Sequence, residues 1–169
     1  AIAAIVSKEC HSWDSKCIMC EDSYESGSAG PWDVLVNKYN CQQYGCDETI
    51  DYNGKTYHRI SCSYGLAQTM YPTAWGLGYR GKPEGLYDAG TSIDLLAKYF
   101  TTQLKDCNGN LEGAAANYNA GGNNGCNPTS YSSNYVQTYN SWGSCIQFAK
   151  IAYSWPLDSQ YKHFTLCFG

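Results

Sequence analysis

Ten cysteines spread along a chain of 169 residues constrain its fold more than any other feature of the sequence. An even number of cysteines in a chain of this size is typical of disulfides that form in an oxidising compartment. From ten cysteines we expect up to five disulfides, in a protein that is secreted, extracellular or periplasmic. The spacing leaves their connectivity open. The cysteines are Cys10, Cys17, Cys20, Cys41, Cys46, Cys62, Cys107, Cys126, Cys145 and Cys167.

A zinc site is the alternative use of the cysteines in the first third of the chain. Cys17 and Cys20 have the spacing of half a zinc knuckle, and Cys41 and Cys46 would supply the other half. The second pair is more widely spaced, and no histidine follows it at ligand distance. We therefore favour disulfides over a metal site.

Composition excludes several classes of protein. Hydrophobic residues make up 43% of the chain and aromatic residues 15%, which is enough for a core and excludes a disordered acidic chain. A formal net charge of −4 without a basic run argues against a nucleic-acid partner or binding to an anionic membrane. The longest apolar run, residues 1–6, is far shorter than the ~18 residues that span a bilayer. We expect a monomer, and we expect it to be trimmed from a longer precursor, since Ala1 already lies in an apolar helical pattern.

Hydrophobic periodicity predicts a mainly α-helical fold, and the length of 169 residues predicts a single domain of residues 1–169. Asn53-Gly54, flanked by alternating residues, predicts a β-hairpin over residues 49–60. Residues 10–62 hold six of the ten cysteines, and we interpret them as a disulfide-stapled insertion rather than a second domain. The segments predicted to form or begin helices are residues 1–9, 32–39, 65–74, 91–104, 111–120, 133–139 and 144–153.

Three separated segments carry side chains that could take part in chemistry. The first ends an apolar helix face with the carboxyl group of Glu9, and the second is a glycine turn followed by the amide of Gln68. The third is a small-residue helix that ends in Tyr118 and Asn119. The segments read IAAIVSKECH from residue 2, SYGLAQTM from residue 63 and AANYNAG from residue 115.

Together and in this order, the segments resemble the lysozyme-like family that includes goose-type lysozymes and soluble lytic transglycosylases (glycoside hydrolase family 23). That family shows a helix ending in a catalytic Glu, usually followed by Ser, then Gly-Leu-Met-Gln, then Ala-Tyr-Asn-Ala-Gly. The resemblance covers residues 1–9 and 63–136, about half the chain. It implies a lysozyme-like fold and cleavage of the β-1,4 bond between N-acetylmuramic acid and N-acetylglucosamine in peptidoglycan, without metal or cofactor.

The resemblance makes Glu9 the candidate catalytic acid. Cleaving a glycosidic bond needs a proton on the leaving oxygen, so a carboxylic acid must stay protonated near neutral pH. Desolvation raises the pKa of a carboxyl group, and the apolar residues before Glu9 would supply the desolvating wall.

The same resemblance implies roles for residues of the second and third segments. Tyr118 would place its hydroxyl near Glu9 and the reacting sugar, Gln68 would orient substrate or backbone, and Asn119 would hold the following turn. All of these side chains have alternative roles in packing or capping. The substrate-binding candidates are Ser63, Gln68, Tyr118, Asn119 and Tyr135.

Glu25 is the alternative acid, because Glu25-Ser26-Gly27 also looks like the family's Glu-Ser-Gly. Asp22 and Glu21 precede it by three and four positions, so we expect a solvated acidic face there rather than a core stripe. We therefore favour Glu9 over Glu25.

Cys10 stands where the family usually has Ser. We expect it to form a disulfide within the insertion. A nucleophilic pair of Cys10 and His11 is the alternative, which the even number of cysteines and the differing directions of adjacent helical residues disfavour.

A second carboxylate determines the reaction outcome after protonation. An inverting hydrolase needs one ~6.5–9.5 Å away to activate water. A transglycosylase instead returns its Glu as base to the sugar's own 6-hydroxyl and closes a 1,6-anhydro ring. Met70 stands where goose-type enzymes carry an Asp, and Asp14 and Asp22 are the remaining candidates. We favour lytic cleavage, with a hydrolytic lysozyme or chitinase and a non-catalytic glycan-binding module as alternatives.

The expected partner is peptidoglycan or a related polysaccharide that contains N-acetylglucosamine. Aromatic rings stack on sugars as well as filling cores, so both uses are open for the tryptophans and tyrosines of the first half. The candidates for stacking are Trp13, Trp32, Tyr71, Trp75 and Tyr79.

Overall fold

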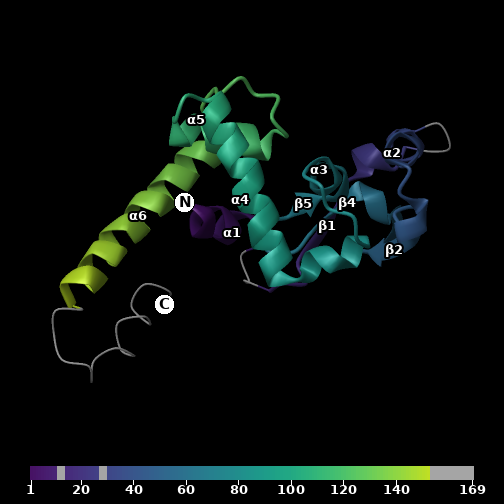
Figure 1. The fold of residues 1–169 in the computed structure, drawn as a ribbon, viewed down its shortest axis with the longest axis horizontal. Coiled ribbons are helices and arrows are strands. Elements are labelled where there is room, and N and C mark those ends of the chain that lie inside the picture. Colours follow the sequence, from purple (N-terminus) through teal and green to yellow (C-terminus); the bar gives the residue numbers. More distant parts are fainter. Residues whose placement is uncertain (11–13, 27–29, 153–169) are drawn as a thin grey trace. The chain divides into compact units, whose positions relative to one another are not determined.

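Helices α1 to α6 dominate the described part of the chain and confirm the mainly α-helical fold (Figure 1). The computed structural model describes residues 1–10, 14–26 and 30–152, with side chains as far as residue 142. The chain forms two compact units. The N-terminal unit comprises residues 2–102, and the C-terminal unit comprises residues 103–169 with Ala1. No helix of the described residues combines the length and the apolar character needed to cross a membrane.

Helix α1 (Ile2–Glu9) confirms the first predicted helix. Its buried residues, Ala4, Ile5 and Val6, form the apolar stripe expected from the sequence, and Ala4 and Ile5 are fully shielded from solvent. The backbone N–H of Cys10 donates to the carbonyl of Val6 at 2.9 Å, which extends the helical hydrogen bonding one residue past Glu9.

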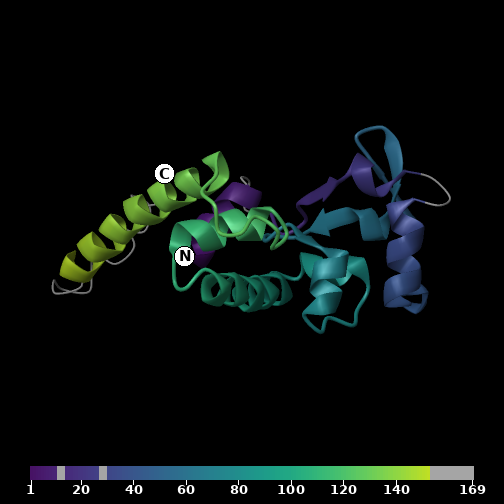
Figure 2. The ribbon, with the colours of Figure 1, turned by 90° about the horizontal axis from the view of Figure 1, so that it is seen from above.

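A small antiparallel sheet of β1 (Ile18–Cys20), β4 (Cys62–Tyr64) and β5 (Thr69–Met70) forms the centre of the N-terminal unit (Figure 2). Strand β4 is the middle strand, and Ser63 pairs with Met19 on one side and with Met70 on the other. Most of β4 and all of β5 belong to the second sequence segment, and β1 pairs with β4 on the side opposite β5.

The predicted hairpin is confirmed as β2 (Thr49–Tyr52) and β3 (Lys55–His58). Asn53 and Gly54 connect them with φ angles of 50° and 78°. Positive φ at both central residues gives the turn the twist that matches the right-handed twist of the strands.

The prediction that a helix begins within residues 65–74 is wrong for the first half of this range. Gly65 and Gln68 adopt φ angles of 73° and 46°, which a right-handed helix cannot accommodate. The chain turns there and pairs Thr69–Met70 with β4. Helix α3 (Tyr71–Gly76) begins only afterwards, with Pro72 in its first turn.

One hydrophobic core unites the cysteine-rich insertion with the rest of the N-terminal unit. Helix α2 (Pro31–Tyr39), another confirmed prediction, contributes Val36. Tyr57 and Ile60 of the insertion belong to the same cluster as Tyr71 of α3. The buried members are Cys20, Val36, Cys41, Cys46, Tyr57, Ile60, Cys62, Tyr64, Tyr71, Ala74, Leu86 and Leu95.

All eight cysteines whose side chains are described form disulfides, as expected. These include the four cysteines considered for zinc, and they include Cys10, so the nucleophile pair of Cys10 and His11 is excluded. The side chain of Cys145 and all of Cys167 lie outside the described residues. The pairs are Cys10–Cys17, Cys20–Cys62, Cys41–Cys46 and Cys107–Cys126.

Helix α4 (Ala89–Asp106) contains the boundary between the two units. It begins two residues before the predicted start at Thr91, because Asp88 provides the cap. The Asp88 carboxylate accepts hydrogen bonds from the backbone N–H and the hydroxyl of Thr91, at 2.7 and 2.8 Å.

The C-terminal unit packs α5 (Leu111–Asn119) against α6 (Ser130–Ala152). The Asn110 side chain caps α5 by accepting from the Gly113 N–H at 3.1 Å. The sequence predicts two short helices over 133–139 and 144–153, but one helix, α6, joins the two ranges and continues to Ala152, the last described residue. A lone glycine such as Gly143 costs a helix only about 1 kcal/mol and need not end it.

We predict that the disulfides contribute unequally to stability. Cys20–Cys62 spans 42 residues and Cys41–Cys46 spans 5, and the cost of loop closure in the unfolded chain grows with loop length. Replacing both cysteines by Ala should lower the free energy of unfolding by about 4 kcal/mol for the first pair and about 2 kcal/mol for the second. Guanidinium titration followed by circular dichroism measures both, and equal losses would contradict the prediction.

We predict that the Asp88 cap is lost in acid. The pKa of Asp88 lies below its ordinary value of 3.8, mainly because of the Thr91 N–H and then because of the Thr91 hydroxyl. Since the folded pKa is depressed, the stabilisation is present above the unfolded pKa and disappears as the pH falls through the folded one. Asp88→Ala should therefore lower the melting temperature at pH 6 and have little further effect at pH 2. A pH-independent difference in thermal unfolding would refute this.

Candidate active site

Glu9 occupies the last turn of α1, where the helix meets the insertion. Its side chain is partly buried, and the residues three and four positions before it, Val6 and Ile5, are buried completely or nearly so. The apolar wall predicted from the sequence is therefore present along the helix that carries Glu9.

A tight turn after β4 forms the second part of the site. Gly65 has a φ of +73°, and a Cβ added there would lie 2.2 Å from the carbonyl oxygen of Leu86, so no side chain fits. The Gly65 N–H donates to the carbonyl of Cys17 at 2.8 Å, and the Ala67 N–H donates to the Ser92 hydroxyl at 3.1 Å. The turn is thus held from both sides by segments distant in sequence.

The structure brings together Ser63 and Gln68, two of the predicted site residues. The Gln68 side-chain amide donates from Nε2 to the Gly65 carbonyl at 2.9 Å, which leaves Oε1 to face the Ser63 hydroxyl, also at 2.9 Å. Ser63 Oγ also lies 3.2 Å from the carbonyl of Met19, and its single hydrogen serves one of these two acceptors at a time. In this structure Gln68 orients the backbone of its own turn.

The remaining predicted residues lie in the C-terminal unit. Tyr118 is 9% exposed in the buried run of α5, and Asn119 is exposed directly after it. Tyr135 on α6 is fully buried, and burial is the main reason that its pKa rises to about 12. It stacks with Tyr139 at a centroid distance of 6.2 Å.

Asn117, which no sequence motif singled out, holds the loop after α5. Its side-chain oxygen accepts from the Cys126 N–H at 2.9 Å, and its backbone carbonyl accepts from the Gly122 N–H at 2.7 Å. The family resemblance assigns this turn to Asn119 instead. Asn117 lies two residues before Asn119, on the buried side of the helix. Its hydrogen-bond partner Cys126 belongs to a disulfide whose pairing could not be predicted from the spacing of the cysteines.

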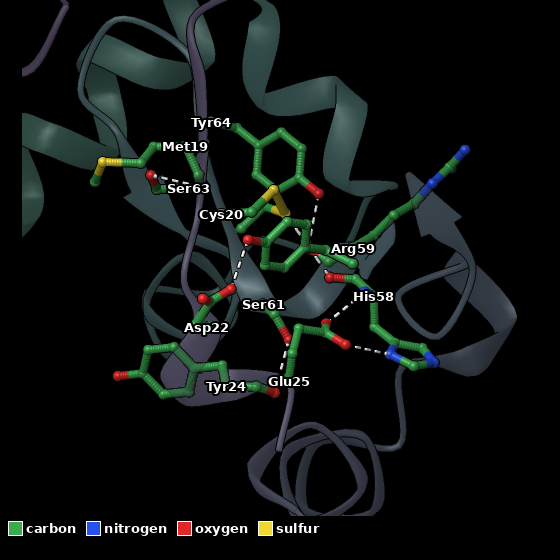
Figure 3. The surroundings of a disulfide bond; sticks show 12 residues. Met19, Cys20, Asp22, Tyr24, Glu25, His58, Arg59, Ser61, Ser63 and Tyr64 are labelled. Carbon is green, nitrogen blue, oxygen red and sulfur yellow. Dashed lines mark hydrogen bonds and ion pairs between the residues drawn. A yellow bond between two sulfur atoms is a disulfide. The ribbon is translucent and has the colours of Figure 1, made fainter. Parts of the chain in front are cut away.

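Glu25 is not on a solvated face, and this expectation is corrected. Its side chain is only 7% exposed, and Oε2 lies 2.8 Å from Nδ1 of His58 (Figure 3). The other carboxylate oxygen accepts from the backbone N–H of His58. The His58 ring stacks on Trp32 at a centroid distance of 3.7 Å. Each oxygen of Glu25 therefore has a hydrogen-bond partner in His58.

The two other carboxylates considered for activating water also have partners nearby. Asp22 is exposed and accepts from Lys55 and Tyr57, each at 2.6 Å; the hydrogen bond from Lys55, followed by that from Tyr57, lowers its pKa. Asp14 accepts from the Lys16 N–H at 2.9 Å. Met70, in the position of the missing Asp, pairs with Ser63.

Several of the aromatic rings that were candidates for stacking on sugars make contacts within the protein. Tyr71 is fully buried, with its hydroxyl donating to the Gly81 carbonyl at 2.9 Å. The Arg80 guanidinium lies 4.1 Å from the centroid of the Trp75 ring and covers one of its faces. Trp13 lies outside the described residues. Among those residues, no group of three or more His, Cys, Asp or Glu side chains is placed to hold a metal ion.

A family model described as Transglycosylase SLT domain matches residues 47–141, more than half of the chain. The chain belongs to this transglycosylase family. The match includes Ser63, Gln68, Tyr118 and Tyr135 and begins after Glu9. It confirms the family resemblance, through the second and third segments; the first segment lies outside the match. Comparisons with curated proteins and with solved structures gave no match.

We predict that Glu25 is a structural residue. Glu25→Gln should lower the free energy of unfolding by about 1.5–3 kcal/mol, because a buried, charge-assisted pair with His58 is lost. Asp22→Asn, the matched change of an exposed carboxylate three residues away, should have a smaller effect. Chemical denaturation of both variants compares them, and an equal loss would argue against a structural role for the buried pair.

Proposed function

We propose that this protein cleaves the β-1,4 bond between N-acetylmuramic acid and N-acetylglucosamine in peptidoglycan, as a lytic transglycosylase with Glu9 as its single catalytic residue. Membership of the SLT transglycosylase family supports transglycosylase-type activity on peptidoglycan in general. The observation that carries the proposal is the glycine turn at Gly65, which holds Gln68 against Ser63 within that family's match.

Glu9 is proposed as the acid on two grounds. It ends a helix whose inner face is buried, which is the environment that keeps a carboxylic acid protonated. Its rival, Glu25, has both oxygens engaged with His58. The family match begins after both residues, so it does not discriminate between them.

The proposed reaction needs no second carboxylate. The Glu9 carboxylic acid donates its proton to the glycosidic oxygen as the bond from that oxygen to C1 of the muramic sugar breaks. The Glu9 carboxylate then accepts the proton of the same sugar's 6-hydroxyl, whose oxygen bonds to C1. The products are a 1,6-anhydro end and a free 4-hydroxyl, and Glu9 is again protonated. The engagement of Asp22 with Lys55 and Tyr57 fits this route better than water activation.

The other site residues are proposed to bind or align the glycan. Ser63 and Gln68 lie at the Gly65 turn, and Tyr118, Asn119 and Tyr135 belong to the C-terminal unit. The family resemblance implies substrate-binding roles for these residues. The family match runs across the boundary between the two units, which supports one catalytic domain formed by the whole chain. The four disulfides between described cysteines fit a secreted or periplasmic location.

We predict that Glu9→Gln abolishes cleavage of purified peptidoglycan while Glu25→Gln retains it when both variants are folded. A glutamine cannot supply a proton, and general acid catalysis typically contributes 10²–10⁴-fold. Mass spectrometry of the soluble fragments gives both the rate and the product type, with wild type as the reference.

Each result has a distinct meaning. Fragments with 1,6-anhydro ends support lytic cleavage, whereas reducing ends would indicate a hydrolytic lysozyme. Activity on chitin alone would change the substrate. An active Glu9→Gln beside an inactive, folded Glu25→Gln would overturn the assignment of the acid. A wild type that binds peptidoglycan without releasing fragments would refute the enzymatic function.

A further inference from the structure

The disulfide Cys10–Cys17 begins at the residue directly after Glu9. Cys10 is 1% exposed, and its N–H donates to the Val6 carbonyl at 2.9 Å, so this residue closes the last turn of α1. Its sulfur is bonded to Cys17, seven residues later. The end of the helix is thereby joined covalently to the residue that precedes β1.

The other end of this disulfide is attached to the glycine turn. The carbonyl of Cys17 accepts from the Gly65 N–H at 2.8 Å. The carbonyl of Gly65 in turn accepts from the Gln68 backbone N–H at 3.1 Å and from its side-chain Nε2 at 2.9 Å. One disulfide and a chain of hydrogen bonds therefore connect Cys10, the neighbour of Glu9, with Gln68.

We propose that Cys10–Cys17 is a positioning element that fixes the Glu9 carboxyl relative to the Gly65–Gln68 turn. The inference rests on the proposed role of Glu9. Helix α1 has eight residues, too few for its own hydrogen bonds to keep it formed, and terminal turns are where helices fray. Burial of Ala4, Ile5 and Val6 holds the middle of the helix, whereas the disulfide holds the end.

The covalent link matters because catalysis is sensitive to small displacements. A misplacement of about 1 Å in a reacting group can cost about 10²-fold in rate. The residue after the acid is usually Ser in this family, and a hydroxyl group cannot form the bond that Cys10 makes here. The family's usual Ser could therefore not supply this positioning role.

Cys41–Cys46 provides a matched control. It closes a loop of similar length, 5 residues against 7, and both of its cysteines are fully buried. It lies between α2 and β2 and includes no neighbour of a proposed site residue. Cys20–Cys62 is unsuitable as a control, because Cys62 adjoins Ser63.

The test compares two double variants of the full chain, Cys10→Ser with Cys17→Ser and Cys41→Ser with Cys46→Ser. We expect the first to lower kcat on peptidoglycan fragments by about 10–100-fold with KM changed less than about twofold. The second should change kcat less than about twofold, although both lose stability. Far-UV circular dichroism and thermal unfolding establish that each variant is folded at the assay temperature.

Several outcomes would overturn the inference. The first double variant restores the family's usual Glu-Ser pair, so an unchanged kcat would mean that the disulfide only stabilises the fold. Equal losses of kcat in both variants would point to general destabilisation. An inactive wild type would instead refute the proposed function itself, and a fully active Glu9→Gln would overturn the assignment of Glu9 as the acid, on which this inference rests.

If the Cys10→Ser, Cys17→Ser variant does not fold, chemical reduction of the folded wild type tests the same disulfide. Dithiothreitol reduces the disulfide to two thiols and is itself oxidised to its cyclic disulfide, and Cys17 is the more exposed of the two cysteines. We expect the loss of activity to follow alkylation of Cys17, measured by peptide mass spectrometry, and to reverse on reoxidation before alkylation. Full activity with Cys17 completely alkylated would overturn the inference.

Discussion

The close approach of the backbone at Gly65 is the constraint on which the arrangement of the N-terminal unit depends. Any side chain there would collide with the carbonyl of Leu86, and the φ of +73° favours glycine independently. Because Gly65 has no side chain, three separated segments can contact this turn. Cys17 accepts a hydrogen bond from Gly65, and Ser92 accepts one from Ala67. The carbonyl of Leu86 lies against Gly65. The hydrogen bond between Gly65 and Cys17 directly adjoins the pairing of β1 with β4, in which Ile18 lies opposite Tyr64.

The disulfides build the core of this unit as well as closing its loops. Charged residues make up only 15% of the chain, so few ion pairs are available, and Cys20, Cys41, Cys46 and Cys62 are buried among aromatic side chains. The insertion has no separate core in the described residues, because Tyr57 and Ile60 belong to the same cluster as Tyr71 and Leu86, which lie after the insertion in sequence. This packing explains why the cysteine-rich residues 10–62 belong to the N-terminal unit and do not form a separate compact unit.

The two candidate acids differ in what surrounds their carboxyl groups. Glu25 is more buried than its sequence neighbours suggested, and its oxygens accept hydrogen bonds from His58, which supports the structural role predicted for it. Glu9 is partly buried beside an apolar helix face and next to the disulfide at Cys10. A catalytic acid has to be desolvated and also within reach of its substrate. The sequence around Glu9 and Glu25 did not show whether either residue meets both conditions.

Short-range features were predictable from the sequence because neighbouring residues determine them. The stripe of Ile5 and Val6 indicated α1, Asn53-Gly54 indicated the hairpin, and the segments containing Gln68 and Tyr118 indicated the family. The even number of cysteines indicated disulfides without their partners. The helix and the hairpin depended on conformational preferences and spacings within a few residues, whereas the family and the disulfides were indicated by the order of the motifs and the number of cysteines along the whole chain.

Long-range pairing decided the rest. Residues 65–70 form a turn and a strand because β4 offers hydrogen bonds to Thr69 and Met70, which no local propensity reveals. Glu25 is buried because His58, 33 residues away, folds against it. Cys10 pairs with Cys17 among nine possible partners because the end of α1 and the start of β1 meet in space. The free energy that selects these pairings comes from contacts that exist only once the chain has folded.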